Sequence, residues 1–186
     1  RQAIADNLNA RFNCNAKASE LFMTCGCAPA LVSVAHALTT SPEDEFIAIA
    51  PYFPEYDVFF TCAGAKLAVV PADTVHFQID MEALEKTINE HSVAVVINSP
   101  NNPSGVVYTE ETLKKIAELL DRKSKEYGHP IYIVADEPYR ELVYDGVKVT
   151  FIPNVYDNTI VCYSWSKSLS LPGERIGYVY VPEQCE

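Results

Sequence analysis

The 186-residue sequence lacks several features that mark particular classes of protein. No apolar run approaches the roughly 20 residues of a membrane-spanning helix, and no signal-peptide pattern opens the chain. Basic residues are scarce, because 14 Lys and Arg stand against 25 Asp and Glu, for a formal charge of −11. This balance argues against nucleic acid or an anionic membrane as the main partner.

The cysteines and histidines show no metal-binding or disulfide pattern. Cys25 and Cys27 lack the two-residue spacing of a redox or zinc pair, and the four histidines are scattered. Most of the six cysteines lie in apolar surroundings. We therefore expect reduced thiols, no metal site and a cytoplasmic protein.

Apolar runs of strand length alternate with segments of helical periodicity. Expected strands cover 21–24, 46–50, 66–70, 93–97, 131–135, 159–163 and 176–181. Expected helices cover the opening segment through Phe12, then 30–38, the segment from Pro54 through Phe60, 80–89 and 109–127, with Asp80 and Thr109 at helix starts. Continuous apolar strands between helices predict one α/β domain: a mostly parallel sheet in a three-layer αβα arrangement.

Unusual residues follow several of these strands. They are Cys27, Phe53, Asn102, Asp136 and Lys167. Because ligands of parallel sheets bind outside the carboxyl ends of the strands, this coincidence predicts a site at that edge.

The most informative of these residues is Lys167, which lies among three serines just past an expected strand, with Arg175 eight residues on. Lysine amines form imines with carbonyl compounds, and serine hydroxyls with an arginine suit a phosphate group. For a lysine taken alone, an exposed position on a polar turn is the plainer alternative. The assignment of Lys167 as a reactive residue therefore depends on the motifs around it.

Three ordered motifs resemble those of the class I and II aminotransferases, pyridoxal-phosphate enzymes of the aspartate-aminotransferase fold. They are Pro100-Asn101-Asn102-Pro103-Ser104-Gly105, Ala135-Asp136-Glu137-Pro138-Tyr139, and Ser164-Trp165-Ser166-Lys167 with Gly173-Glu174-Arg175-Ile176-Gly177. Each motif alone is weakly specific, whereas the ordered set is strongly so. The resemblance implies an enzyme that moves an amino group between an α-amino acid and a 2-oxo acid, with pyridoxal 5′-phosphate as cofactor.

The same resemblance bears on domain organisation. The chain begins inside a helical pattern without an N-cap and stops just after its last expected strand. We expect residues 1–186 to be most of the large cofactor-binding domain of a homodimeric protein. The N-terminal arm and the C-terminal small domain would then lie outside this chain.

The resemblance gives two residues catalytic roles. Lys167 would hold the cofactor as a Schiff base and move a proton between the substrate Cα and the cofactor C4′. Asp136 would keep the pyridine nitrogen protonated, so that the ring accepts electrons. The alternative for Asp136 is an N-cap of a helix that follows the strand.

Other residues would contact the cofactor ring. Tyr139 and Asn102 resemble the pair that hydrogen-bonds the 3′ oxygen, although a core tyrosine and a turn asparagine are alternatives. Phe53 would stack on the pyridine ring, with Tyr52 as its rival and a core aromatic as the alternative for both.

The phosphate would be bound from three sources. Arg175 offers a guanidinium fork, Ser164 a hydroxyl, and Cys27 and Ala28 backbone N–H groups at a helix start. Since Cys27 and Ala28 carry no strong side-chain donor, we expect only their backbones to contribute. Ser166 would either join the phosphate contacts or cap its own turn.

Alternative functions share these motifs. β-Lyases, cyclising synthases and decarboxylases of the same fold differ in substrate orientation, and a pyridoxal-phosphate-binding regulatory domain is a further class. No helix-turn-helix or basic segment supports the regulator. By the resemblance, the arginine that binds the substrate carboxylate lies in the small domain, so we expect this piece alone to be poorly active or inactive. The amino donor is left open.

Overall fold

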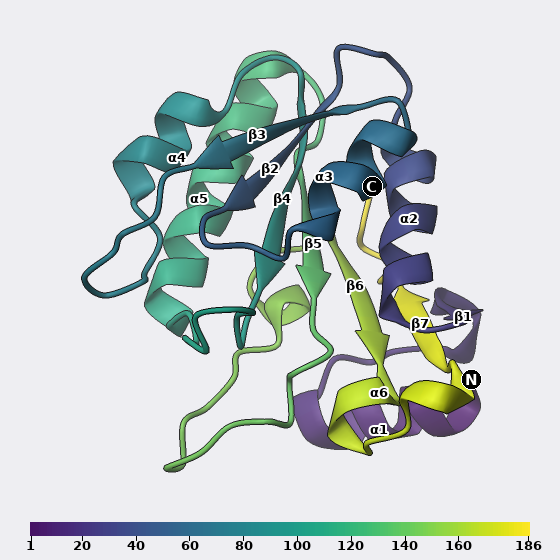
Figure 1. The fold of residues 1–186 in the computed structure, drawn as a ribbon. Coiled ribbons are helices and arrows are strands. Elements are labelled where there is room, and N and C mark those ends of the chain that lie inside the picture. Colours follow the sequence, from purple (N-terminus) through teal and green to yellow (C-terminus); the bar gives the residue numbers. More distant parts are fainter.

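A seven-stranded sheet forms the centre of the computed structural model, which describes residues 1–186 (Figure 1). Its strands are β1 (Leu21–Thr24), β2 (Glu45–Ile49), β3 (Lys66–Val70), β4 (Ser92–Asn98), β5 (Tyr132–Asp136), β6 (Thr159–Ser164) and β7 (Gly177–Tyr180). Their spatial order is β1-β7-β6-β5-β4-β2-β3. The predicted strands are all present, and each boundary lies within one residue of its predicted position.

Most of the sheet is parallel. Strands β2, β3, β4, β5 and β6 run in one direction, whereas β7 is antiparallel to both of its neighbours. Strand β1 pairs with β7 and therefore runs parallel to β6. The carboxyl ends of β1, β2, β4, β5 and β6 consequently meet at one edge of the sheet.

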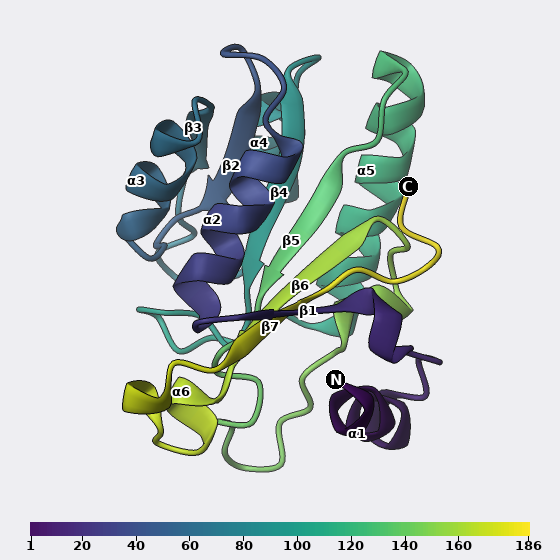
Figure 2. The ribbon, with the colours of Figure 1, turned by 90° about the vertical axis from the view of Figure 1, so that its right-hand side faces the viewer.

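Helices cover both faces, which confirms the three-layer αβα prediction (Figure 2). Helices α1 (Gln2–Phe12), α4 (Met81–Thr87) and α5 (Glu110–Tyr127) share one apolar cluster with the sheet, and α2 (Cys27–Leu38) and α3 (Glu55–Cys62) share the other. Alternating strand residues supply the two clusters: Val95 and Ile97 face α5, whereas Ala94 and Val96 face α2 and α3. No helix is both long and apolar enough to span a membrane.

The starts of α4 and α5 have the predicted caps. The Asp80 carboxylate accepts the backbone N–H groups of Glu82 and Ala83, both at 3.0 Å, and the Thr109 hydroxyl accepts the N–H of Thr112 at 3.1 Å. These contacts satisfy donors that have no partner inside a helix.

Helix α3 ends two residues later and α4 two residues earlier than predicted. Two other helical segments differ more. Helix α2 begins at Cys27, three residues before the predicted start, so that Pro29 lies in its first turn. Helix α6 (Trp165–Ser168) was not predicted, because four residues are too few to show a helical period.

Close backbone packing joins β7 to the start of α2. A Cβ atom on Gly177 would lie 2.5 Å from the carbonyl oxygen of Tyr163 and 2.8 Å from the carbonyl carbon of Gly26. Glycine at position 177 therefore permits the close approach of three backbone segments.

A buried ion pair follows β5. The side chains of Glu137 and Arg140 are 1% and 3% exposed, and they form a salt bridge. The Arg140 guanidinium also lies over the rings of Tyr163, Phe151 and Phe12, at 4.7, 5.2 and 5.3 Å from their centroids. The charge of Arg140 is thus enclosed by one carboxylate and three aromatic faces.

Candidate functional site

A cavity of about 270 Å³ lies at the edge where the parallel strands end. It is lined by Cys27, Ala28, Leu31, Phe53, Asn98, Asn102, Asp136, Pro138, Tyr139, Ser164, Ser166, Lys167, Pro172 and Arg175. The structure thus brings together all ten site residues named from the sequence. Tyr52, the rival of Phe53, lies outside the cavity lining and stacks on Tyr56.

Strand alternation explains why three polar side chains reach this cavity together. Asn98, Asp136 and Ser164 are the last residues of β4, β5 and β6, and each lies an even number of positions from the strand residues that face α2 and α3. In the sheet register, Asn98 is directly opposite Asp136. The apolar face of the sheet therefore ends in a row of polar groups.

The Asp136 carboxylate is buried and accepts hydrogen bonds from three side chains. The Cys27 thiol donates to Oδ1 at 3.0 Å, and the Tyr56 hydroxyl donates to Oδ2. The Asn98 amide lies 3.4 Å from Oδ2 and donates to the Asp136 carbonyl at 2.8 Å. Burial raises the pKa of Asp136, and the hydrogen bonds from Cys27 and Tyr56 act in the opposite direction.

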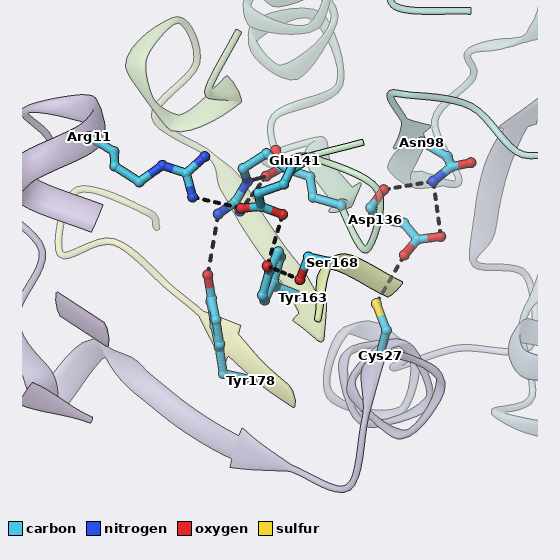
Figure 3. Close-up of polar contacts among 10 residues, drawn as sticks. Arg11, Cys27, Asn98, Asp136, Glu141, Tyr163, Ser168 and Tyr178 are labelled. Carbon is cyan, nitrogen blue, oxygen red and sulfur yellow. Dashed lines mark hydrogen bonds and ion pairs between the residues drawn. The ribbon is translucent and has the colours of Figure 1, made fainter. Parts of the chain in front are cut away.

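The alternative of a helix cap at Asp136 is wrong. The residues that follow β5 form turns rather than a helix, and the carboxylate points toward α2 (Figure 3). A buried carboxylate that faces a cavity and accepts neutral donors is suited to bind a cationic or N–H group of a ligand.

The Cys27 thiol contacts Asp136, which the sequence did not predict, and the expected backbone contribution of Cys27 to a phosphate stays a prediction. Burial, together with the charge of Asp136, raises the pKa of Cys27 well above its ordinary value, so the thiol stays protonated and donates. The backbone N–H groups of Cys27 and Ala28 lie in the first turn of α2, where a helix offers them no partner.

Arg175 brings positive charge to the same helix start. Its guanidinium packs so closely against Gly26 that a Cβ there would lie 2.5 Å from Nη2. Gly26 also has φ 110°, a conformation that favours glycine. Arg175 Nη1 donates to the Pro172 carbonyl at 3.0 Å, which orients the side chain. Free N–H groups, the helix dipole and a guanidinium together favour an anion at this end of the cavity.

Lys167 lies on α6 and lines the cavity. Its Nζ is 6.0 Å from the centroid of the Tyr139 ring, and its side chain is exposed. Ser166 lies within α6 rather than at the cap position, which Ser164 occupies. The amine is therefore accessible to a ligand in the cavity.

A hydrogen-bond network holds the end of α6 in place (Figure 3). The Tyr163 hydroxyl is 2.9 Å from both Glu141 Oε2 and Ser168 Oγ. Arg11 of α1 in turn donates to Glu141 Oε1 at 2.6 Å. Since Ser168 follows Lys167 directly, this network links the lysine-bearing helix to α1 and to the segment after β5.

Tyr139 and Asn102 lie on neighbouring parts of the cavity lining. Burial and the charge of Asp136 raise the pKa of Tyr139, whereas its interaction with the Asn102 side chain lowers it. The Asn102 backbone N–H donates to Asn98 Oδ1 at 2.6 Å, which anchors this loop to the end of β4.

Sequence reasoning missed two residues of the site. Asn98 is a polar residue at the end of an apolar strand, and its alternation with Ala94 and Val96 could have revealed its direction. Tyr56 gave no such signal, because its contact with Asp136 joins positions 80 residues apart. No group of three or more His, Cys, Asp or Glu side chains is arranged to hold a metal ion.

Comparison with known proteins identifies similar chains. The family model described as aminotransferase class I and II matches residues 1–186. A probable N-acetyl-LL-diaminopimelate aminotransferase of Bacillus subtilis is 34% identical over 94% of this chain and 42% of its own length. A probable aspartate/prephenate aminotransferase of Aquifex aeolicus is 36% identical over 99% of this chain and 46% of its own.

Solved structures agree with these relatives. An amino transferase from Eubacterium rectale superposes with a TM-score of 0.98 and 62% identity, covering 99% of this chain and 46% of that one. Aspartate aminotransferase from Thermus thermophilus with maleate superposes with a TM-score of 0.87 and 30% identity, covering 97% of this chain and 46% of that one. The chain thus spans a little under half the length of the relatives it matches.

Proposed function

The chain belongs to the class I and II aminotransferases, and we propose that it binds pyridoxal 5′-phosphate in the cavity at the strand ends. In the whole protein, this site would move an amino group between an α-amino acid and a 2-oxo acid. One observation carries the proposal: Lys167 and Asp136, from the ends of adjacent strands, line one cavity.

The residues present fit this cofactor. The cavity volume of about 270 Å³ is close to the lower end of the roughly 300–1,000 Å³ of small-molecule sites. A phosphate group would meet Arg175, Ser164, Ser166 and the N–H groups that open α2, including those of Cys27 and Ala28. A ring nitrogen would meet the buried carboxylate of Asp136.

Two side chains would perform the proton chemistry. When bound, pyridoxal phosphate supplies an electron-accepting ring that stabilises the charge left at the substrate Cα. Lys167 would remove the proton from Cα and return it at the cofactor C4′ carbon. Asp136 would hold the proton at the ring nitrogen, because a buried anion favours the protonated form of a facing base.

Other side chains would orient the ring. Tyr139 and Asn102 would hydrogen-bond its 3′ oxygen, and Phe53 would cover one face of it. The edge-on contact between Phe53 and Tyr56, with ring centroids 5.8 Å apart, supports this position for Phe53.

Several properties of the whole protein belong to the same proposal. Residues 1–186 would be its large cofactor-binding domain, and the protein would be a cytoplasmic homodimer with amino acids and 2-oxo acids as substrates. The length of the relatives, about twice that of this chain, supports further segments. The chain alone would transaminate poorly or not at all.

Borohydride reduction of the full-length protein with pyridoxal phosphate tests the lysine. Peptide mass spectrometry should find the pyridoxyl group on Lys167. The Lys167→Ala variant should lose it, whereas a Lys148→Arg variant, changed in an exposed loop, should keep it. A pyridoxyl group on another lysine would refute the assignment.

Turnover of a panel of amino donors with 2-oxoglutarate tests the reaction. Formation of glutamate supports an aminotransferase, whereas ammonia release or ring closure without glutamate supports a lyase or a cyclising synthase. Cofactor binding to Lys167 without any turnover supports a regulatory domain. Turnover by residues 1–186 equal to that of the full-length protein would contradict the proposed need for the missing segments.

A further inference from the structure

We propose that the Cys27 thiol is a positioning residue, which fixes the Asp136 carboxylate so that one of its lone pairs faces the cavity. This inference rests on the proposed function, because it assigns Asp136 to the ring nitrogen of pyridoxal phosphate. The contact itself, 3.0 Å from Sγ to Oδ1, is independent of any ligand.

The geometry gives the two carboxylate oxygens different surroundings. Oδ2 has the Tyr56 hydroxyl and, at 3.4 Å, the Asn98 amide, whereas Oδ1 has only the thiol. A carboxylate offers roughly four acceptor positions, and three donors lie against Asp136. One position is left for the N–H of a ligand.

A thiol suits this arrangement because it is a weak donor. It orients Oδ1 without drawing much of the negative charge away from that oxygen. Asp136, Cys27 and Tyr56 are only 5%, 9% and 1% exposed, so these contacts have little access to solvent. The weak hydrogen bond therefore acts in a largely dry environment, where it is stronger than in water.

The position of Cys27 also connects two parts of the cavity. It is the first residue of α2, so its backbone belongs to the helix start beside Arg175 while its side chain reaches Asp136. One residue thus connects the anion-binding end of the cavity to the carboxylate. A displacement of the helix start would be transmitted to Asp136 through this contact.

The chain contains a matched control. Cys162 is also a buried cysteine, and in the sheet register it is directly opposite Asp136. Its thiol makes no hydrogen bond to Asp136 and does not line the cavity. Cys162→Ala therefore removes a buried thiol close to the same carboxylate without removing the proposed contact.

The first experiment follows the ring nitrogen of pyridoxal phosphate labelled with ¹⁵N, bound to full-length protein. Cys27→Ala should shift the nitrogen resonance toward the unprotonated form and weaken cofactor binding by about threefold to tenfold, the range of one hydrogen bond. Cys27→Ser retains a donor and should restore most of the wild-type resonance, and Cys162→Ala should leave it unchanged. A Cys27→Ala resonance identical to that of wild type would overturn the proposal.

The second experiment uses no cofactor. In the ligand-free full-length protein, ¹³C NMR of the Asp136 carboxyl should show a higher pKa in Cys27→Ala, because the ionised form loses a donor. An equal rise in Cys162→Ala, or none in Cys27→Ala, would refute the role of the Cys27 thiol. If wild type failed to bind the cofactor at Lys167, the proposed function would fall, yet this titration would still decide whether the thiol supports Asp136.

Discussion

Replacing Tyr56 with phenylalanine removes one hydroxyl and leaves the ring packing intact. The ring is 1% exposed, and it lies against Phe60 and Phe53 at centroid distances of 6.0 and 5.8 Å. The hydroxyl donates to the buried Asp136 carboxylate. Tyr56→Phe therefore tests one hydrogen bond to a charged group without creating a large cavity.

The expected loss of stability follows from the charge of the acceptor. A hydrogen bond to an ionised group contributes about 1.5–3 kcal/mol to the free energy of unfolding, against about 0.5–1.5 kcal/mol for a neutral one. For a domain of this size, each kcal/mol lowers Tm by about 2–4 °C. Tyr56→Phe should thus lower Tm by about 3–12 °C at neutral pH.

The loss should depend on pH. Burial raises the pKa of Asp136 above its ordinary value of 3.8, and loss of the Tyr56 donor should raise it further. A carboxyl group with a raised pKa destabilises the folded state as pH rises from 3.8 through that pKa, because it must ionise while buried. The stability difference between wild type and variant should therefore grow over this range and level off at higher pH.

Urea unfolding at a series of pH values from 4 to 8 measures this difference. Tyr156→Phe is the matched control, because its buried hydroxyl donates at 2.7 Å to a neutral group, the carbonyl of Ile131. The control should lose stability by an amount that is constant over this pH range. A Tyr56→Phe loss that is equally constant, or smaller than that of the control, would show that the hydroxyl does not stabilise an ionised Asp136.

Three further substitutions test the fold around the site. Gly177→Ala should destabilise the protein by at least about 1–3 kcal/mol in urea unfolding, since its Cβ would meet the Tyr163 carbonyl oxygen at 2.5 Å; an unchanged midpoint would contradict this packing. Arg140→Met should cost about 3–5 kcal/mol, because it leaves the Glu137 carboxylate buried without its cation, and adding Glu137→Leu should recover part of the loss. A double variant less stable than Arg140→Met would refute that explanation. Asp80→Ala should cost about 1 kcal/mol through loss of the cap, whereas no change in the unfolding midpoint would show that the cap is dispensable.

Local pattern was sufficient to predict the strands and their common edge. The continuous apolar runs of β4, β5 and β6 reflect burial on both faces, and this requirement is visible in sequence. The start of α2 was predicted three residues too late, although Pro29 suits the first turn of a helix, where the structure places it.

The gathering of Lys167 and Asp136 around one cavity could be predicted because each residue follows a recognisable strand, whereas Arg175 was placed there by the family resemblance. The side chains that hydrogen-bond Asp136 could not be predicted. Cys27 lies 109 positions away and Tyr56 lies 80 positions away, and no local period encodes which side chains meet across such separations. These contacts depend on the packing of α2 and α3 against the sheet.

The pairing of β1 with β7 has a consequence for the newly made chain. The only strand partner of β1 (Leu21–Thr24) is the last strand of the sheet, which begins at Gly177, so 177 − 24 = 153 positions separate them. On the ribosome, at about 5–20 residues per second, β1 would wait roughly 8–30 s without a neighbour. During that interval its unpaired backbone and the side chain of Leu21, which is buried in the folded chain, are available to chaperones or to other nascent chains.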